Sequence, residues 1–87
     1  MTIYIIKNFT RWEFYLGIAE KNPKEAIEKH RRDPWSPLSH WRWDKEEIRW
    51  GEVEGDLPPD TAIAFLRALR REPPEEGWTL VYAPEEG

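Results

Sequence analysis

The stretch from Thr2 to Ala19 reads TIYIIKNFTRWEFYLGIA, and it decides the fold. Its first part, Thr2–Lys7, is rich in β-branched and aromatic residues, which favour a strand. After a short turn at 8–11, apolar residues alternate and form one face of a second strand: Trp12, Phe14, Leu16 and Ile18. Two strands joined by so short a turn predict an antiparallel β-hairpin. The opposite face of the second strand is mixed in character, so we expect it to be either solvated or part of a site: Glu13, Tyr15, Gly17 and Ala19.

A helix is expected after the hairpin. Asn22 can cap it, Pro23 suits the first helical position, and Glu25 completes a capping box. The helix has few apolar residues, and Asp33 with the proline after it ends the helix. The next stretch, 33–44, holds three Trp and two Pro, which predicts an ordered surface loop pinned by aromatic side chains.

The rest of the chain is expected to add a strand, a second helix and a short final strand. Residues 47–54 predict the strand, with a bulge or strand end near Gly51. The helix opens at the prolines 58–59, ends before 73–74 and has apolar residues at helical spacing: Ala62, Phe65, Leu66 and Leu69. Cations crowd its last turns, as the carbonyl end of a helix favours. The pattern at 78–82 predicts the short strand, before an acidic tail at 85–87 that we expect to fray.

This order of elements predicts one α+β domain over residues 1–87. The expected fold is a small ββαβα(β) sandwich, in which the hairpin and the third strand form a sheet and the helices pack against one face. A length of 87 residues allows a single domain. A hydrophobic fraction of 39%, with six Trp, is too high for a disordered chain.

Composition also excludes several kinds of site. The chain has no Cys, so disulfides, thiol nucleophiles and Cys-type zinc sites are excluded, and only His30 and His40 could offer imidazole to a metal. Apolar runs are too short to cross a bilayer, and the stretch 3–6 lacks the basic leader of a secretory signal. We therefore expect a cytoplasmic protein without a membrane partner. The eight Pro and the scarcity of labile side chains indicate thermostability.

Charge is distributed unevenly along the chain. The formal net charge is −4, yet residues 1–50 carry ten Lys or Arg against eight Asp or Glu, a net charge of +2. Residues 51–87 carry three against nine, a net charge of −6. An anionic partner would therefore meet the first half of the chain.

Two tyrosines give the hairpin a specific pattern. The triplet Ile3-Tyr4-Ile5 is followed, eleven positions after its tyrosine, by Tyr15-Leu16-Gly17, and the next helix carries His30. Over residues 2–72, this order resembles the GIY-YIG nuclease domain. The resemblance implies phosphodiester hydrolysis in which the two tyrosines and His30 are catalytic and Gly17 allows close approach. The residues alone leave a plainer alternative, because tyrosine packs well in strands and His30 can be a hydrogen-bonded residue of a helix end.

The chain departs from this family at the charged positions of the site. The resemblance places an Arg one helical turn before His30, where the residue is Ala26, and a metal-binding Glu in the second helix, where it is Leu66. The first glycine of the family's motif is Ile3. Losing one preorganised charge commonly costs about 10² to 10³ in rate. The resemblance therefore implies a degenerate member that is catalytically inactive and holds no metal or other cofactor.

Three functions follow from these features. The first is an inactive domain that binds DNA or RNA weakly through basic residues: Lys24, Arg31, Arg32, Arg42 and Arg49. The second is a module that binds a protein partner or a second copy of itself through tryptophans: Trp35, Trp41, Trp43 and Trp50. The third is an active nuclease with relocated charges, which would need Mg²⁺ or Mn²⁺ held by Glu20 or Glu52.

The stretch 40–50 bears on the first two functions, because it interleaves cations and indoles. Stacking on bases and pairing with phosphates would use such a pattern. In the plainer alternative, which we favour, one or two Trp cover a small core, and Arg packs over them or pairs with local acids: Asp44, Glu46 and Glu47. Six Trp nevertheless exceed what a core of this size hides, so we expect some of them at an interface.

Overall fold

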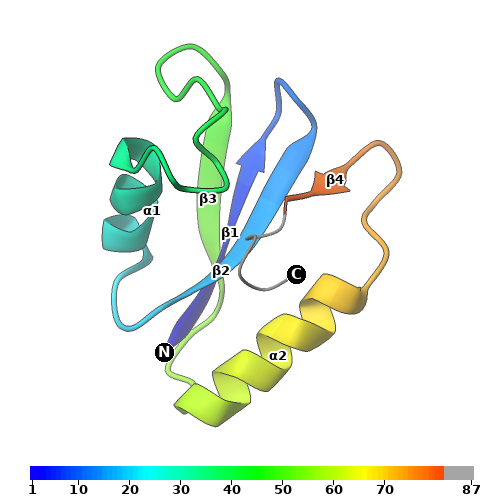
Figure 1. Ribbon diagram of the computed structural model, residues 1–87. Helices are drawn as coiled ribbons and strands as arrows, with labels where there is room; N and C mark the ends of the chain where they lie inside the picture. Colours follow the sequence, from blue (N-terminus) through cyan, green and yellow to red (C-terminus); the bar gives the residue numbers. More distant parts are fainter. Residues whose placement is uncertain (82–87) are drawn as a thin grey trace.

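The computed structural model describes residues 1–81 and shows a small α+β fold (Figure 1). The elements follow in the order β1 (Thr2–Asn8), β2 (Glu13–Ala19), α1 (Pro23–Arg32), β3 (Ile48–Glu54), α2 (Pro59–Arg71) and β4 (Thr79–Leu80). This is the order of elements that the sequence predicts. The end of the predicted final strand, at Tyr82, and the acidic tail lie outside the described residues.

The four strands form one mixed sheet in the order β3-β1-β2-β4. Strand β1 is antiparallel to both β2 and β3, and β4 runs parallel to β2 over two residues. The hairpin turn is held by the buried Asn8, whose Oδ1 accepts hydrogen bonds from the backbone N–H groups of Thr10 and Arg11, each at 3.0 Å. The Asx turn thus explains why the chain reverses directly after β1.

The bulge in β3 lies close to Gly51, as the sequence predicts, but two residues further along the strand. Gly51 sits in the regular ladder opposite Ile5. The register shifts further on, where Glu52 faces Tyr4 and Glu54 faces Ile3, so that Val53 is the extra residue. The apolar pattern of β3 therefore does change phase, but the change comes at Val53, because Gly51 keeps its place in the pairing.

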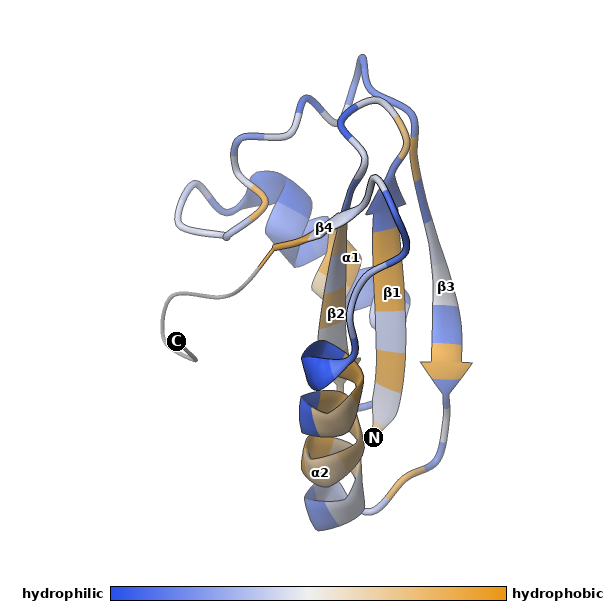
Figure 2. Cartoon of the chain, turned by 90° about the vertical axis from the view of Figure 1, so that its right-hand side faces the viewer, coloured by the Kyte–Doolittle hydropathy of each residue, from blue (hydrophilic) through white to orange (hydrophobic). Residues whose placement is uncertain are grey.

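The helices cover opposite faces of the sheet, which corrects the prediction that they share one face. On the α1 side, Tyr4, Ile6 and Tyr15 pack with Ile27 of the helix. On the α2 side, the core cluster joins four residues: Ile3, Leu16, Leu66 and Leu80. The reason is that β1 carries apolar or aromatic residues at four consecutive positions, Ile3 to Ile6, so both of its faces must be buried. Figure 2 shows two hydrophobic bands along β1 with a paler band between them.

Helix α1 begins with the predicted asparagine cap and proline, and the loop after it completes the core. The Asn22 side chain accepts a hydrogen bond from the backbone N–H of Lys24 at 3.0 Å, and a proline follows the cap. Because α1 buries little apolar surface, the loop 33–47 supplies two more core residues, Leu38 and Trp41, which are 0% and 3% exposed. The predicted ordered loop pinned by aromatic side chains is confirmed.

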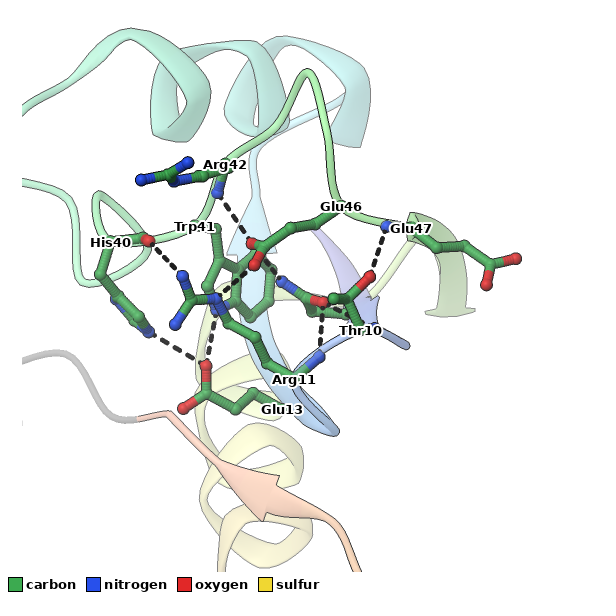
Figure 3. Close-up of polar contacts among 9 residues, drawn as sticks. Thr10, Arg11, Glu13, His40, Trp41, Arg42, Glu46 and Glu47 are labelled. Atoms are coloured by element: carbon green, nitrogen blue, oxygen red, sulfur yellow. Dashed lines mark hydrogen bonds and ion pairs between the residues drawn. The ribbon is translucent and has the colours of Figure 1, made fainter.

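One carboxylate fastens this loop to the hairpin turn (Figure 3). Glu46 accepts hydrogen bonds from Asn8 Nδ2 at 3.1 Å, from Arg11 Nε at 2.6 Å and from the backbone N–H of Arg42 at 2.8 Å. Partial desolvation opposes ionisation, but these three donors together hold the pKa of Glu46 below its usual value. Nearby, Trp41 Nε1 donates to Glu13 Oε1 at 2.9 Å, so the buried indole is paired.

Candidate functional site

The two motif tyrosines and the helix histidine meet in one cavity of about 410 Å³ on the α1 side of the sheet. The rings of Tyr15 and His30 lie edge to face with centroids 4.9 Å apart. The Tyr4 centroid lies 6.3 Å from that of Tyr15 and 6.5 Å from that of His30. We call this cavity, lined among others by Tyr4, Tyr15, His30 and Arg70, the tyrosine pocket.

The hairpin register places the two tyrosines together. Tyr4 pairs with Gly17, and Tyr15 precedes that glycine by two residues on the same face of β2. A Cβ atom at position 17 would lie 2.5 Å from both Cζ and Oη of Tyr4 and 2.8 Å from Cε2 of Tyr15. The rings can therefore lie across β2 only because this position has no side chain.

A chain of hydrogen bonds runs from the pocket into the loop. Tyr4 Oη lies 3.1 Å from His30 Nε2, and His30 Nδ1 lies 2.6 Å from Ser36 Oγ. The backbone N–H of Leu38 also donates to Ser36 Oγ at 3.1 Å. The sequence contains no pattern that would have singled out Ser36, because its contact with His30 depends on how the loop folds.

The electrostatics of the pocket keep the Tyr4 phenol and the His30 imidazole neutral. Burial, and to a smaller extent the adjacent Tyr15, raises the pKa of Tyr4 far above its usual value, although Arg70 opposes this. Burial also lowers the pKa of His30, against the opposing effect of Asp33. A neutral imidazole has one donor and one acceptor nitrogen. The two hydrogen bonds of His30 therefore run in one direction. Either Ser36 donates to His30 and His30 donates to Tyr4, or Tyr4 donates to His30 and His30 donates to Ser36.

Arg70 is a residue of the pocket that the sequence analysis did not assign to it. Beyond Phe14, no strand among residues 1–81 pairs with the outer edge of β2, and α2 passes beside this edge. Arg70 Nη2 donates to the carbonyl oxygen of Leu16 at 2.6 Å, and its guanidinium carbon lies 5.9 Å from the centre of the Tyr15 ring. The side chain thus reaches from the α2 side, around the edge of the sheet, to the tyrosines.

A signal for Arg70 was present in the sequence. Ala62, Leu66 and Arg70 follow one another at four-residue intervals, which places them on one stripe of the helix. Ala62 and Leu66 are buried, and Arg70 continues their stripe as a half-buried residue. The sequence analysis explained Arg70 by the preference of cations for the carbonyl end of a helix, and did not consider its four-residue spacing from Leu66.

The two positions where the GIY-YIG resemblance expects charges face the same pocket. Ala26 and Leu66 both line it. The other charged residues that line it are Lys29 and Asp33. Glu20 and Glu52, the candidates for relocated metal ligands, are exposed and are not among the described residues that line the pocket. Within residues 1–81 there is no group of three or more His, Asp or Glu that could hold a metal ion.

The predicted nucleic-acid-binding residues lie on three separate parts of the molecule. Lys24, Arg31 and Arg32 are on α1, Arg42 is in the loop, and Arg49 is on β3. Several lie beside acids: Arg31 and Arg32 are 3.9 Å and 3.7 Å from Glu28, and Arg49 is 3.1 Å from Glu47. The structure does not bring these residues together at the pocket. The ion pairs of the three arginines favour the plainer alternative, in which basic side chains pair with local acids.

The predicted tryptophan interface divides into two groups. Trp35 is 89% exposed and Trp50 is 44% exposed. Trp41 is a core residue, and Trp43 is partly buried against it with ring centroids 5.7 Å apart. Placing Trp41 on a contact surface was therefore wrong. The loop covers the sheet on the α1 side, and the indole of Trp41 packs into the core there. Trp12, which the prediction omitted, is 53% exposed.

Comparison of the chain with protein-family models, with curated proteins and with solved structures gives no match. Neither helix in the described part of the chain has the length and apolar character needed to cross a membrane. The chemistry of the tyrosine pocket therefore rests on its own groups: one guanidinium, one ammonium, one carboxylate, one serine hydroxyl, two phenols and a neutral imidazole.

Proposed function

We propose that this protein binds nucleic acid by holding a phosphate group in the tyrosine pocket, without cutting it. The observation that carries the proposal is Arg70, which lies beside the rings of Tyr4 and Tyr15. Guanidinium groups suit phosphate because their planar N–H donors match its oxygens. One N–H group of Arg70 binds the Leu16 carbonyl oxygen, which fixes the side chain in place.

The residues around Arg70 support an anion as the ligand. Lys29 adds a second cation, so that two cations face the single carboxylate of Asp33, and phenol hydroxyls can donate to phosphate oxygens. When Ser36 donates to His30 Nδ1, His30 Nε2–H donates to Tyr4, and the Tyr4 hydroxyl can then donate to a ligand. The neutral imidazole thus allows Tyr4 to act as a donor while both rings keep their ordinary protonation.

The kinship with GIY-YIG nucleases forms part of the same proposal. It is supported by the fact that six positions matched to that family line one pocket: Tyr4, Tyr15, Gly17, Ala26, His30 and Leu66. The loss of cleavage is supported by the apolar residues at the two positions where the family has charges. Phosphodiester hydrolysis needs stabilisation of the charge that develops on phosphate, and one guanidinium replaces only part of it.

The test is oligonucleotide binding by fluorescence anisotropy at about 50 mM salt, where phosphate contacts are strongest. Arg70→Gln should weaken binding by about 10- to 100-fold, as expected for losing a hydrogen-bonded charge. Arg67→Gln removes the same charge from an exposed position of the same helix and should change affinity little. Equal affinities of the two variants would contradict the phosphate pocket. Nicking of a plasmid with Mg²⁺ or Mn²⁺, abolished by Tyr15→Phe, would contradict the loss of cleavage.

Self-association is the second candidate function, and exposed indoles favour it. Trp12, Trp35 and Trp50 expose 53%, 89% and 44% of their surface. Tryptophan is enriched where proteins bind one another. Light scattering over a range of protein concentrations tests this candidate, since a mass that stays that of one 10.5 kDa chain would contradict it.

A further inference from the structure

The most exposed large hydrophobic side chain of the described residues lies at the tyrosine pocket. Trp35 is 89% exposed and is also one of the residues that line this pocket. Its neighbour in sequence, Ser36, is buried and binds His30. The indole therefore projects into solvent from a segment whose next residue is part of the pocket wall.

The backbone that carries Trp35 is held in place. The backbone N–H of Trp35 donates to Asp33 Oδ1 at 2.9 Å, and that of Ser36 donates to the Asp33 carbonyl oxygen at 3.1 Å. Prolines at positions 34 and 37 restrict the segment further. An exposed aromatic ring on a restricted backbone loses little entropy when it binds a partner.

We infer that the ligand is a single-stranded nucleic acid, with one phosphate in the tyrosine pocket and an unpaired base stacked on Trp35. This inference rests on the function proposed above. Bases in a duplex are stacked on both of their faces, whereas an unpaired base offers a face to an indole. The unpaired base is the chemistry shared by single-stranded DNA and RNA, and both kinds of strand can supply it.

The charge distribution supports the same class of ligand. The net charge is −4, and three arginines outside the pocket lie beside acids: Arg31, Arg32 and Arg49. Duplex binding commonly uses a broad phosphate-binding surface, which this charge distribution does not favour. Binding through one phosphate and one stacked base predicts a shallow salt dependence, with a slope of log affinity against log salt of about −0.7.

The experiment uses labelled oligothymidylate and oligouridylate of about 12 nucleotides, a duplex of equal length and an abasic single strand. Trp35→Ala should weaken binding of the two base-bearing single strands by about 5- to 150-fold, while Trp35→Phe should keep most of the affinity. Trp50→Ala removes an exposed indole that is not among the described residues lining the pocket, and it should change nothing. Trp35→Ala should also have no effect on the abasic strand.

The outcomes separate this inference from the proposed function. If Arg70→Gln abolishes binding but Trp35→Ala behaves as Trp50→Ala does, the stacked base is wrong and the phosphate pocket stands. Tighter binding of the duplex, or a salt slope several times steeper than expected, would also overturn the single-strand ligand. If the unmodified protein binds none of the four probes, both proposals are wrong. The relative affinities of the thymidylate and uridylate strands identify DNA or RNA as the preferred source.

Discussion

At the scale of single residues, the tyrosine pocket depends on a side chain that is missing. Gly17 lies under both tyrosine rings, and the space that a Cβ atom would need is already filled by Tyr4. The triplet Tyr15-Leu16-Gly17 therefore has a structural meaning apart from any family resemblance. The glycine is needed because the ring of Tyr4, from the neighbouring strand, lies where its Cβ atom would be.

We predict that Gly17→Ala lowers the free energy of unfolding by about 1–3 kcal/mol, the usual cost of overpacking a core. The physical reason is the 2.5 Å separation between the new Cβ and Tyr4. Urea unfolding followed by circular dichroism measures the change. Gly51→Ala is the matched control in β3, because nothing lies within 4 Å of its Cβ position. The control should be neutral or stabilising by up to about 1 kcal/mol. Similar losses in both variants would contradict the steric argument.

At the scale of elements, strand β1 and the loop 33–47 explain where the helices and the core lie. The run Ile3–Ile6 is apolar without alternation, a pattern typical of strands buried on both faces. The prediction that both helices pack on one face did not take this pattern into account. The loop was harder to predict, because its buried residues do not follow a helical or strand period and depend on the sheet beneath them.

Glu46 joins the loop to the hairpin turn through three donors. Glu46→Ala should lower the free energy of unfolding by about 1–3 kcal/mol, because it leaves the buried Asn8 amide and two further donors without their acceptor. The adjacent Glu47→Ala is the control, because it removes an exposed carboxylate that pairs only with Arg49 among the described ion pairs. It should change the free energy of unfolding by no more than about 0.5 kcal/mol. Thermal and urea unfolding of both variants measure the difference, and equal stabilities would argue against the anchor.

At the scale of the whole molecule, the site is assembled from both sides of the sheet. Tyr4 and His30 come from β1 and α1, whereas Arg70 comes from α2 on the opposite side. Within residues 1–81, β4 pairs with β2 only at Glu13 and Phe14, which leaves the next part of this edge to α2. The Leu16 carbonyl oxygen, two residues further along that edge, accepts the hydrogen bond of Arg70.

The pocket should also give the stability of the whole molecule a dependence on pH. Burial lowers the pKa of His30 from its ordinary value of 6.5, so the unfolded chain binds a proton at a higher pH than the folded one. The contribution of His30 to stability is therefore complete above about pH 6.5 and is lost as the pH falls toward the lowered folded pKa.

His30→Gln should flatten this part of the stability curve, as measured by urea unfolding between about pH 5 and 8. Carboxylates titrate mostly below this range and affect both proteins alike. A slope that persists unchanged in His30→Gln, or a stability that rises on acidification through pH 6.5 only in the parent protein, would contradict the neutral buried imidazole.

Local patterns in the chain were enough to predict the order of its elements, including the hairpin that carries its two tyrosines. A cap such as Asn22, an alternating strand or a helix opened by proline depends on residues within a few positions, and these are present in the sequence itself. Three features depended on tertiary structure: the helices on opposite faces, Trp41 in the core and Arg70 beside Tyr15. Each of them joins segments far apart in the chain, and their geometry exists only once the sheet has an edge and two faces to be covered.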